Sequence, residues 1–503
     1  MTDLLSTEEY IAIAADINFP VQAFINGQFQ KPAAGNTMAT INPATGEILA
    51  HVFACDSADV DHAVEVSRTA FDKGSWSQKH PAERKAVLLK LAQLIEDNQL
   101  ELAVLESLES GKPISECVLT DLPETVATIQ WHAEAIDKMY DQISPANADG
   151  IGLIVREAMG VVACVLPWNF PLMMLAWKIA PALAGGNSVI VKPAEQTSMT
   201  ALRIGELAFE AGIPAGVLNI LPGMGPEVGE PIGRHPGIEA VSFTGSTEIG
   251  RLFLQFSAQS NLKKVVLECG GKNPSVVLSD AENLDSVAEH VVYAALWNMG
   301  QNCTANSRLI VHKSLQQELL AKVKEKLLDW HTGDPLDPAN QLGSIIFKEQ
   351  YDKILGYIES AKREGAELVW GGSAISGPGL FIEPTFFVGV TADMTIAQEE
   401  IFGPVFAMMV VDSDEDAIKL ANDTCYGLQA SLFTSSVTKV HRYGRALQAG
   451  TVSVNCYGEG DMTTPFGGYK LSGFGGRDNS LMAHDQYTET KTIWIDLTGD
   501  ISG

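Results

Sequence analysis

Short apolar runs alternate with amphipathic segments along the middle of the chain. The runs are rich in Val, Ile and Leu, and the segments between them carry apolar residues at helical spacing. This alternation is typical of βαβ units and predicts parallel sheets covered by helices. The predicted strands are 161–166, 188–191, 217–221, 239–243, 265–267, 274–278 and 309–312, and the predicted helices are 200–211, 247 onward, 284–299 and 315–330.

The alternation restarts after the strands at 265–267 and 274–278. We therefore expect an α/β protein with two parallel-sheet domains that meet near Gly270-Gly271. Before residue 150 the pattern is mainly helical, with predicted helices at 60–71, 83–98 and 123–139.

Two strand-like segments, 151–156 and 487–496, lie outside the βα pattern, and a polar, turn-rich stretch at 141–150 precedes the first. They could pair across subunits. Residues 159–177 carry no charge and approach the length of a membrane span. Because Pro167, Asn169 and Pro171 interrupt this segment, we expect a buried strand that turns into a helix instead.

Composition fits a large soluble protein and excludes some partners. The 503 residues are 46% apolar and 19% charged, which favours a globular chain of more than one domain. A net charge of −28 would repel nucleic acid and anionic membranes. The N-terminus has no basic segment before an apolar one, and seven scattered cysteines suit a reducing compartment, so we expect a cytoplasmic protein.

Cys303 is the candidate nucleophile. It follows Gly300-Gln-Asn302 in a predicted loop, where a thiol is accessible and backbone N–H groups can lower its pKa. The alternative is a structural thiol, which is the more common role of a cysteine taken alone. Cys164 lies inside an apolar strand and is assigned to the core.

Glu268 is the candidate general base. It ends a predicted parallel strand beside Gly270-Gly271, where open α/β sheets place their ligands. Partial burial would raise its pKa toward neutrality. An ion pair with Lys263 or Lys264 is an equal alternative.

Two further strand ends offer cofactor contacts. Residues 243–250 open a helix at Gly245-Ser246, whose N-terminal amides could hold a pyrophosphate, although the segment does not match Gly-x-Gly-x-x-Gly. Lys192 and Glu195 could bind ribose hydroxyls, and a carboxylate there would favour NAD over NADP. A solvated loop is the alternative for both. Asn169 could donate to an oxyanion or cap the following helix.

Seven motifs together resemble the aldehyde dehydrogenase superfamily, in its order and spacing, from about Phe24 to about Asp496. They are Pro167-Trp-Asn-Phe-Pro171, Lys192-Pro-Ala-Glu195, Phe243-Thr-Gly-Ser246, Leu267-Glu-Cys-Gly-Gly-Lys272, Gly300-Gln-Asn-Cys303, Glu399-Glu-Ile-Phe-Gly-Pro404 and Pro465-Phe-Gly-Gly468.

The resemblance implies an NAD-dependent enzyme that oxidises an aldehyde through a thiohemiacetal and a thioester on Cys303, without a metal. Glu268 would activate the hydrolytic water, which argues against a CoA-dependent branch, and Asn169 with the Cys303 backbone N–H would form the oxyanion hole. The residues implied to contact NAD are Leu166, Trp168, Lys192, Glu195, Gly245, Ser246, Gln350, Glu400 and Phe402.

The family's plan also implies the domain boundaries. It gives a discontinuous NAD-binding domain over 1–140 and 159–269, a catalytic domain over 270–482 and an oligomerisation arm from 141–158 and 483–503. The fold would thus hold two Rossmann-like domains and a small β arm, in a homodimer or homotetramer.

Within the family, the chain is similar to γ-glutamyl-γ-aminobutyraldehyde dehydrogenases of putrescine breakdown. The likeness rests on 131–138, 460–470 and 491–495. It implies an ω-aminoaldehyde substrate, drawn by carboxylates at the mouth of an aromatic tunnel, although these acids could equally solvate the rim. The implied tunnel residues are Phe170, Trp177, Trp297 and Phe466, and the implied acids are Glu124 and Glu459, with Asp121 and Asp461 nearby.

Two positions depart from the family pattern. Segment 472–478 has one more glycine than usual, which puts in doubt whether Asp478 is the acid partner of Lys178. Cys269 stands where Leu or Ala is usual, so a second thiol could lie near the site. Three other functions stay open: a generalist aliphatic aldehyde dehydrogenase, a cofactor-independent thiol hydrolase or esterase, and a non-catalytic scaffold with the family fold.

Overall fold

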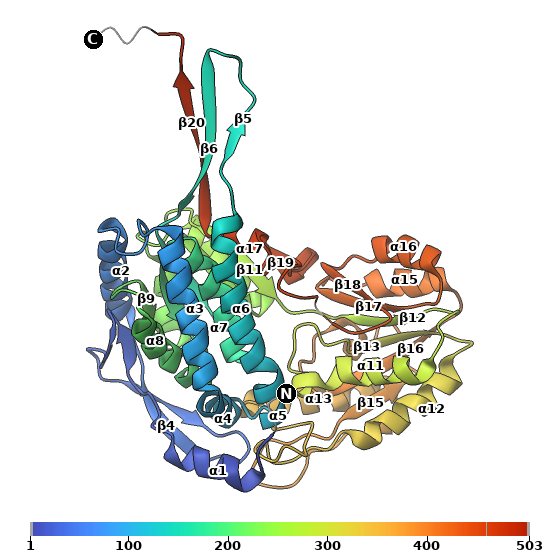
Figure 1. The fold of residues 1–503 in the computed structure, drawn as a ribbon. Coiled ribbons are helices and arrows are strands. Elements are labelled where there is room, and N and C mark those ends of the chain that lie inside the picture. The colour runs from blue at the N-terminus through green and yellow to red at the C-terminus, as the bar shows by residue number, and fades with distance from the viewer. Residues whose placement is uncertain (1–3, 459, 500–503) are drawn as a thin grey trace.

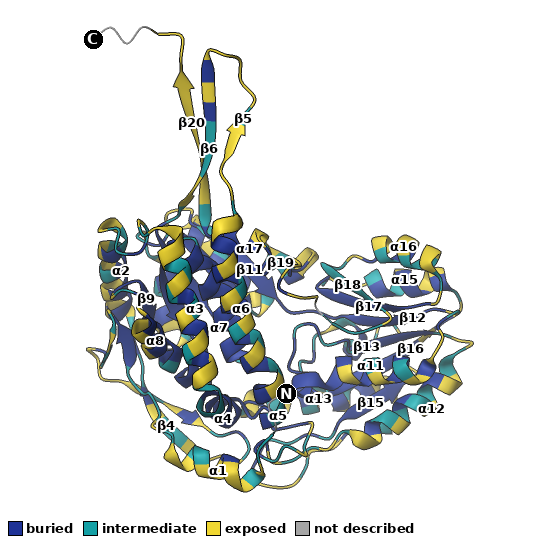
Figure 2. Ribbon diagram, in the orientation of Figure 1, coloured by how far each residue is buried: buried dark blue, intermediate teal, exposed yellow. Residues whose placement is uncertain are grey.

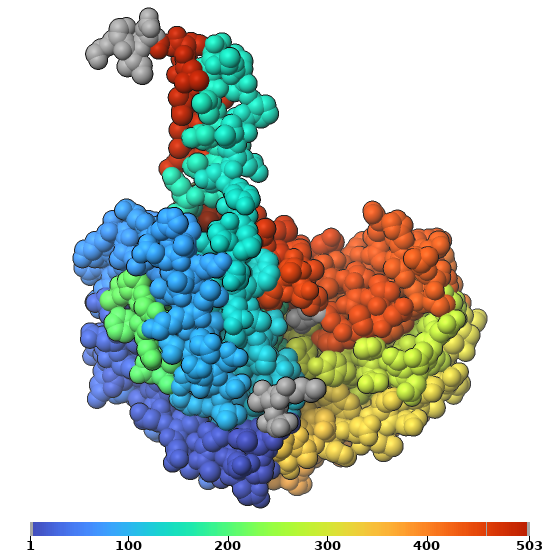
Figure 3. All heavy atoms as spheres, viewed as in Figure 1, coloured from blue at the N-terminus to red at the C-terminus, as the bar shows by residue number. Residues whose placement is uncertain are grey.

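The computed structural model describes residues 4–458 and 460–499 and contains two sheet domains and a projecting arm (Figure 1). One domain holds an eight-stranded sheet and the other a seven-stranded sheet. The arm is a three-stranded sheet that stands clear of both in the space-filling view (Figure 3). The two α/β domains predicted from the alternating pattern are thus present.

The eight-stranded sheet has a parallel centre and antiparallel edges. Its order is β19-β11-β10-β7-β8-β9-β1-β2, and all neighbours from β11 to β9 run parallel. The strands are β1 (Ala23–Ile25), β2 (Gln28–Gln30), β7 (Val161–Val165), β8 (Ser188–Lys192), β9 (Leu218–Ile220), β10 (Ala240–Gly245), β11 (Lys264–Cys269) and β19 (Gly473–Phe474).

Alternate residues of β7 enter two different cores, as the twofold period of a strand requires. Val162 and Cys164 pack into the core that includes α3, α6, α7 and α8, whereas Val161, Ala163 and Val165 pack toward α2, α9 and α10. The helices are α1 (Thr7–Asp16), α2 (Ser57–Asp72), α3 (Pro81–Asp97), α4 (Gln99–Ser110), α5 (Ile114–Glu116), α6 (Leu122–Ala135), α7 (Pro171–Ala184), α8 (Met199–Ala211), α9 (Glu230–Arg234) and α10 (Thr247–Ala258), with π-helical turns η1 (Cys117–Asp121) and η3 (Gly225–Gly229), a 3₁₀ turn η2 (Ile136–Lys138) and a hairpin of β3 (Thr37–Ile41) and β4 (Ile48–Phe53).

The seven-stranded sheet has the order β14-β15-β16-β13-β12-β17-β18 and is parallel except for the edge strand β14. Its strands are β12 (Pro274–Val277), β13 (Arg308–His312), β14 (Glu367–Trp370), β15 (Thr385–Val388), β16 (Val405–Val411), β17 (Gln429–Phe433) and β18 (Thr451–Val454). The helices are α11 (Leu284–Leu296), α12 (Gln316–Lys326), α13 (Lys348–Glu364), α14 (Thr395–Gln398), α15 (Asp414–Asn422) and α16 (Val437–Ala446), with 3₁₀ turns η4 (Trp297–Gly300) and η5 (Leu327–Asp329). The later α17 (Met482–Asp485) contacts α7, and the 3₁₀ turn η6 (Lys470–Ser472) contacts β11, so both lie against the eight-stranded domain.

The arm joins the two strand-like segments that lie outside the βα pattern. β6 (Gly150–Ala158) pairs antiparallel with β20 (Thr488–Asp496) and, on its other edge, with β5 (Gln142–Ser144), a strand inside the stretch expected to be turn-rich. Much of the arm is exposed (Figure 2), including large apolar side chains. These side chains are Ile143, Ile151, Ile493, Trp494, Ile495 and Leu497.

Several predicted boundaries need correction. The helix expected to reach residue 299 ends at Leu296, because Asn298 and Met299 adopt left-handed backbone angles. The described residues before 150 contain five strands as well as helices. The uncharged segment 159–177 is the strand β7 followed by the start of α7, as expected, and in the described residues no helix is long and apolar enough to cross a membrane.

Candidate active site

A cavity of about 1060 Å³, partly open to solvent, lies between the two sheet domains. Residues 167–170 after β7, 244–246 at the end of β10 and 268–270 at the end of β11 line it. Chain order in the sheet reverses between β7 and β10, and such switch points are where open α/β sheets bind ligands. Three of the strand ends chosen from the sequence therefore meet in one cavity, whereas Lys192 and Glu195 at the end of β8 are not part of its lining.

Cys303 lies in the loop between η4 and β13 and is half-buried against the cavity. Asn273 fixes this loop because its Nδ2 donates to the carbonyl oxygens of Cys303, at 2.8 Å, and Ala305, at 3.2 Å. A Cβ atom at Gly271 would come within 2.6 Å of the Cys303 oxygen, so this approach needs a glycine. Cys164, by contrast, is fully buried in β7, as expected.

Asn169 is buried in the turn that follows β7, and its Nδ2 donates to the Gln301 carbonyl at 2.9 Å. An amide nitrogen carries two hydrogens, so one remains for another acceptor in the cavity. No side chain caps α7, so the alternative of Asn169 as the helix cap does not hold. Asn298 reaches the Asn169 carbonyl with its own Nδ2 at 2.9 Å, which links this turn to the Cys303 loop.

Glu268 ends β11 with its side chain buried, and neither carboxylate oxygen has a hydrogen-bond partner within the described residues. The ion pair considered with Lys263 or Lys264 is not formed: Lys263 donates to the Gly233 carbonyl and Lys264 to that of Asp485. Burial, and then the negative charge of Asp478, raise the pKa of Glu268 well above its ordinary value. A buried carboxyl with a raised pKa is suited to proton transfer near neutrality.

Lys178 and Asp478 form an ion pair beside Glu268 despite the extra glycine in segment 472–478. Lys178 Nζ lies 3.2 Å from Asp478 Oδ2 and donates to Ser242 at 3.0 Å, and all three side chains are buried. Asp478 also lines the cavity. Asp478 is therefore the acid partner of Lys178, although the extra glycine had put this pairing in doubt.

Lys192 and Glu195 lie together at the end of β8. Lys192 Nζ is 3.1 Å from Glu195 Oε1, and its burial lowers its pKa. A Cβ atom on Gly225 would lie 3.9 Å from Glu195, and one on Gly229 would lie 3.7 Å from Lys192, so bare backbone faces the pair. Leu166 stands next to it, with its N–H bonded to the Lys192 carbonyl at 3.0 Å.

The other expected cofactor residues line the cavity. Ser246 caps α10 by accepting the Ile249 N–H, and Gly245 precedes it. Glu400 accepts the Gly271 N–H at 2.8 Å, and burial raises the pKa of Glu400 to about 7. Trp168, Gln350 and Phe402 also face the cavity, where Trp168 and Phe402 meet edge to face at 5.2 Å and Gln350 Nε2 donates to the Phe402 carbonyl at 2.8 Å.

The four expected tunnel aromatics pack around the same cavity as Cys303. Phe170 and Trp297 have ring centroids 5.1 Å apart, as do Trp177 and Phe466. Their cluster also holds residues that the sequence did not single out: Met173, Met174, Leu428 and Met462, with Trp131 and Tyr457 at its edge. Helical and loop residues of this kind carry no signal that separates a tunnel lining from a core.

The acids expected at the tunnel mouth differ in their burial. Glu124 is half-buried, and burial and the charge of Asp121 raise its pKa. Asp461 is exposed, and hydrogen bonds from Thr463 lower its pKa. Neither acid lines the cavity itself, and Glu459 lies outside the described residues.

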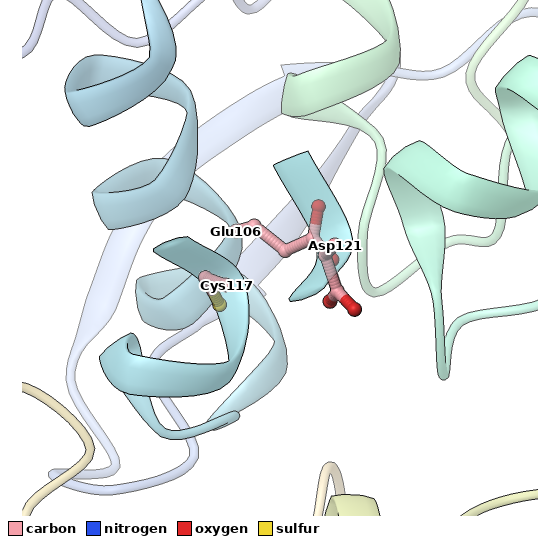
Figure 4. A group of neighbouring side chains, drawn as sticks. All are labelled: Glu106, Cys117 and Asp121. Atoms are coloured by element: carbon pink, nitrogen blue, oxygen red, sulfur yellow. The ribbon is translucent and has the colours of Figure 1, made fainter. Parts of the chain in front are cut away.

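Asp121 is buried and forms an ion pair with Lys112, away from the cavity lining. Glu106 and Cys117 complete this cluster (Figure 4), and Lys112 Nζ also lies 3.4 Å from Glu106. The ammonium group of Lys112 therefore supplies the positive charge that these buried acids require. Lys112 Nζ lies 4.1 Å from the centroid of the Phe170 ring, so the cluster adjoins the tunnel wall.

Glu116 is an acid near the tunnel that sequence reasoning missed. Its Oε2 accepts the indole N–H of Trp297 at 2.8 Å, and burial raises its pKa. The expected second thiol near the site is present: Cys269 lines the cavity, and burial raises its pKa to about 12, so it remains a neutral thiol.

Comparison with known proteins shows what this chain resembles. The model of the aldehyde dehydrogenase family matches residues 29–493. Aminoacetaldehyde dehydrogenase of Pseudomonas aeruginosa is 58% identical over 498 residues, which cover 99% of this chain and 100% of that protein.

Two solved structures superpose on nearly the whole chain. A mutant of the P. syringae AldA indole-3-acetaldehyde dehydrogenase in complex with NAD+ and IAA has a TM-score of 0.97 and 47% identity, and covers 98% of this chain and 100% of its own. The γ-glutamyl-γ-aminobutyraldehyde dehydrogenase of Burkholderia cenocepacia has a TM-score of 0.96 and 46% identity, with the same coverage.

Proposed function

The chain belongs to the aldehyde dehydrogenase family, and from that premise we propose that it oxidises an ω-amino or γ-glutamylamino aldehyde to the carboxylic acid with NAD. The observation that carries the proposal is a cavity that joins Cys303, Glu268 and Asn169 to an aromatic tunnel. Two similar proteins are named for aldehydes of this kind, aminoacetaldehyde and γ-glutamyl-γ-aminobutyraldehyde.

The residues present fit NAD. The bare backbone at Gly225 and Gly229 leaves room beside Lys192 and Glu195 for a ribose, whose hydroxyls the pair can bind. A carboxylate at this position would repel a 2′-phosphate, which supports NAD over NADP. The N-terminus of α10 at Ser246 offers amides for a pyrophosphate, and Gln350, Glu400 and Phe402 lie toward the nicotinamide end. NAD, when bound, supplies the hydride acceptor.

The first half of the reaction takes place at Cys303. Its thiolate adds to the aldehyde carbonyl, and the oxyanion that forms accepts hydrogen bonds from Asn169 Nδ2 and the Cys303 backbone N–H. Because Asn169 is already held by the Gln301 carbonyl, its remaining N–H is oriented before substrate arrives. Loss of hydride from the thiohemiacetal carbon leaves a thioester on Cys303.

Glu268 acts as the general base in the second half of the reaction. It removes a proton from water, the hydroxide attacks the thioester carbonyl, and the carboxylic acid leaves as Cys303 recovers its thiolate. Since the pKa of Glu268 is raised, the rate of this step increases as pH rises through that pKa, until the base is fully ionised. Lys178 and Asp478 lie beside the base and fix its electrostatic surroundings.

The tunnel supports a cationic substrate. Aromatic rings attract an ammonium group through their negative faces. Trp297 donates its indole N–H to Glu116, so a carboxylate lies at the N–H edge of that ring and makes the ring more negative. Lys112 behind Phe170 is neutralised by its ion pair with Asp121, so it does not oppose this attraction.

A substrate panel tests the proposal. Steady-state kinetics compare three aldehydes that carry an ammonium group, aminoacetaldehyde, 4-aminobutanal and 4-(γ-glutamylamino)butanal, with propanal and succinate semialdehyde, using NAD and then NADP. We expect kcat/KM to be at least about tenfold higher for the ammonium-bearing aldehydes, which corresponds to ~1.4 kcal/mol, and higher with NAD. A higher kcat/KM for propanal or succinate semialdehyde than for every ammonium-bearing aldehyde would overturn the substrate assignment.

The proposal includes assembly through the arm, as a homodimer or homotetramer in the cytoplasm, where Cys303 remains a thiol. A three-stranded sheet that exposes Ile143, Trp494 and Leu497 is favourable only when another surface covers it. Light scattering on the purified protein should give twice or four times the chain mass of 54.0 kDa. The mass of a single chain at micromolar concentration would contradict it.

A further inference from the structure

Segment 472–478, with its extra glycine, brings Asp478 to the cavity by an unusual route. Gly473 and Phe474 form β19 on the edge of β11, and the backbone of Asp478 then pairs with that of Phe466 through hydrogen bonds of 2.7 and 2.8 Å. The segment therefore connects the end of the Glu268 strand to the tunnel aromatic Phe466.

Both oxygens of the Asp478 carboxylate have partners in the described chain. Oδ2 pairs with Lys178 Nζ at 3.2 Å, and Oδ1 accepts from Gln486 Nε2 at 3.1 Å. Gln486 also donates to the Arg477 carbonyl, so its amide spans two adjacent acceptors of the same segment. Gln486 is buried, and it ends α17 two residues before the arm strand β20 begins.

Gly476, one of the two adjacent glycines in this segment, makes room for Gln486. A Cβ atom on Gly476 would lie 2.9 Å from Cγ and Cδ of Gln486 and 3.1 Å from Val266 Cγ1. A side chain at 476 would therefore push Gln486 away from Asp478. The backbone at Gly476 does not adopt the left-handed conformation, so alanine is sterically excluded there by Gln486 and Val266 rather than by its own backbone angles.

We propose that Gln486 is a positioning residue for the general base: across the bare backbone of Gly476 it holds Asp478 against Lys178, and so fixes the charge that Glu268 experiences. This inference rests on the proposed function, because it needs Glu268 to activate the hydrolytic water. It assigns a role to Gly476, whose missing side chain keeps the path of Gln486 open.

The electrostatics around Glu268 give the direction of the effect. Asp478 raises the pKa of Glu268, whereas Lys178 and Arg477 lower it by less than burial and Asp478 raise it. Without Gln486, Oδ1 of Asp478 loses its donor, so the carboxylate is no longer held against Lys178 and its negative charge can move away from Glu268. The pKa of Glu268 should then fall. The other titratable groups that line the cavity are Cys269, Cys303, Lys353 and Glu400, and Cys164 and Tyr487 lie close enough to interact with Asp478.

The test is the pH profile of kcat for the full-length Gln486→Met variant, which keeps the side-chain length and removes the donor. We expect the acidic limb of the profile to move down by about half a unit to one unit, and the plateau to fall about two- to fivefold. The KM for NAD should stay the same, since Gln486 does not reach the cofactor residues. A purely structural role would lower the melting temperature and leave the acidic limb in place.

Gly476→Ala provides a second variant that leaves Gln486 in the sequence. Because the new methyl group displaces the amide, it should reproduce the shift of Gln486→Met. Gly444→Ala on α16 is the matched control, since no atom lies within 4 Å of its Cβ position, and its profile should match the wild type.

The outcomes distinguish a failure of the proposed function from a failure of the positioning role of Gln486. If the wild type oxidises no aldehyde, or Glu268→Gln keeps its full kcat, both the proposed function and the positioning role are wrong. If the wild type and Glu268→Gln behave as proposed but Gln486→Met and Gly476→Ala keep the wild-type acidic limb, the positioning role alone is wrong.

Discussion

The two ends of the cavity are built by different means. At the reaction end, hydrogen bonds fix the positions: Asn169 binds the Gln301 carbonyl and Asn273 binds the Cys303 carbonyl, each within 3 Å. At the tunnel end, Phe170, Trp177 and their neighbours are held mainly by ring packing at about 5 Å between centroids, which is within the ordinary range for aromatic pairs. Hydrogen bonds fix the positions of individual atoms to within a few tenths of an ångström, whereas ring packing fixes only the shape of the tunnel.

This difference predicts different tolerance to mutation. A reacting group must hold its geometry within about half an ångström, so changes at the reaction end should cost orders of magnitude in rate. A tunnel can lose one polar contact and still admit its substrate, so changes there should alter KM by small factors. The following experiments measure that contrast.

The largest effect is expected for Cys303→Ala. Removal of the nucleophile should lower kcat by at least about 10⁴-fold, because no thioester can form. Cys269→Ala is the matched control: this thiol lines the same cavity, but its pKa of about 12 keeps it neutral, and its loss should change kcat less than about threefold. If Cys269→Ala is the more damaging variant, the assignment of the nucleophile is reversed.

Asn169→Ala should come next. It removes one oxyanion donor while the Cys303 backbone N–H remains, so kcat should fall on the order of a hundredfold. The KM for NAD should change little, which steady-state kinetics can show. Asn340→Ala controls for the loss of an asparagine hydrogen bond, because the half-buried Asn340 donates its Nδ2 to the Asp334 carbonyl at 3.1 Å and does not line the cavity. A loss of less than about fivefold in kcat for Asn169→Ala would show that the reaction end is not fixed as described.

The positions of Glu268 and Asn169 could be predicted because each lies at or just after the end of a parallel strand, whereas Cys303 was placed only in a loop between regular elements. Glu268 ends a run of buried apolar residues, and parallel strands deliver their ends to one edge of a sheet. The aromatics were located by family resemblance alone, since Phe170 before α7 and Trp177 on that helix, which is apolar except for Lys178, look like core residues. Glu116 could not be found, because the π-helical turn η1 inserts a residue between it and Glu124 and shifts the faces that a 3.6-residue period would predict.

The secondary structure likewise divides into elements that the sequence predicts and elements that it does not. The buried parallel strands are long apolar runs, so β7, β8, β10 and β11 were found within one or two residues of their ends. Strands β1 and β2 have three residues each, and β1 pairs with β9 nearly two hundred residues away, so no local periodicity marks them. The true end of α11 was missed because tertiary contacts, including those of Asn298, impose left-handed angles there.

The smallest effect is expected at the tunnel end, for Glu116→Gln. The variant keeps an acceptor for the Trp297 indole N–H but removes the negative charge at that edge of the ring. The KM for the cationic substrate aminoacetaldehyde should rise about two- to fivefold, since a cation–π contact contributes roughly 0.5–1 kcal/mol, while the kinetics of propanal should not change. Glu364→Gln, a similar change on the far surface of the catalytic domain, should affect neither aldehyde. If Glu116→Gln changes both aldehydes equally, the carboxylate shapes the tunnel rather than selecting charge, and the two ends of the cavity are more alike than their construction indicates.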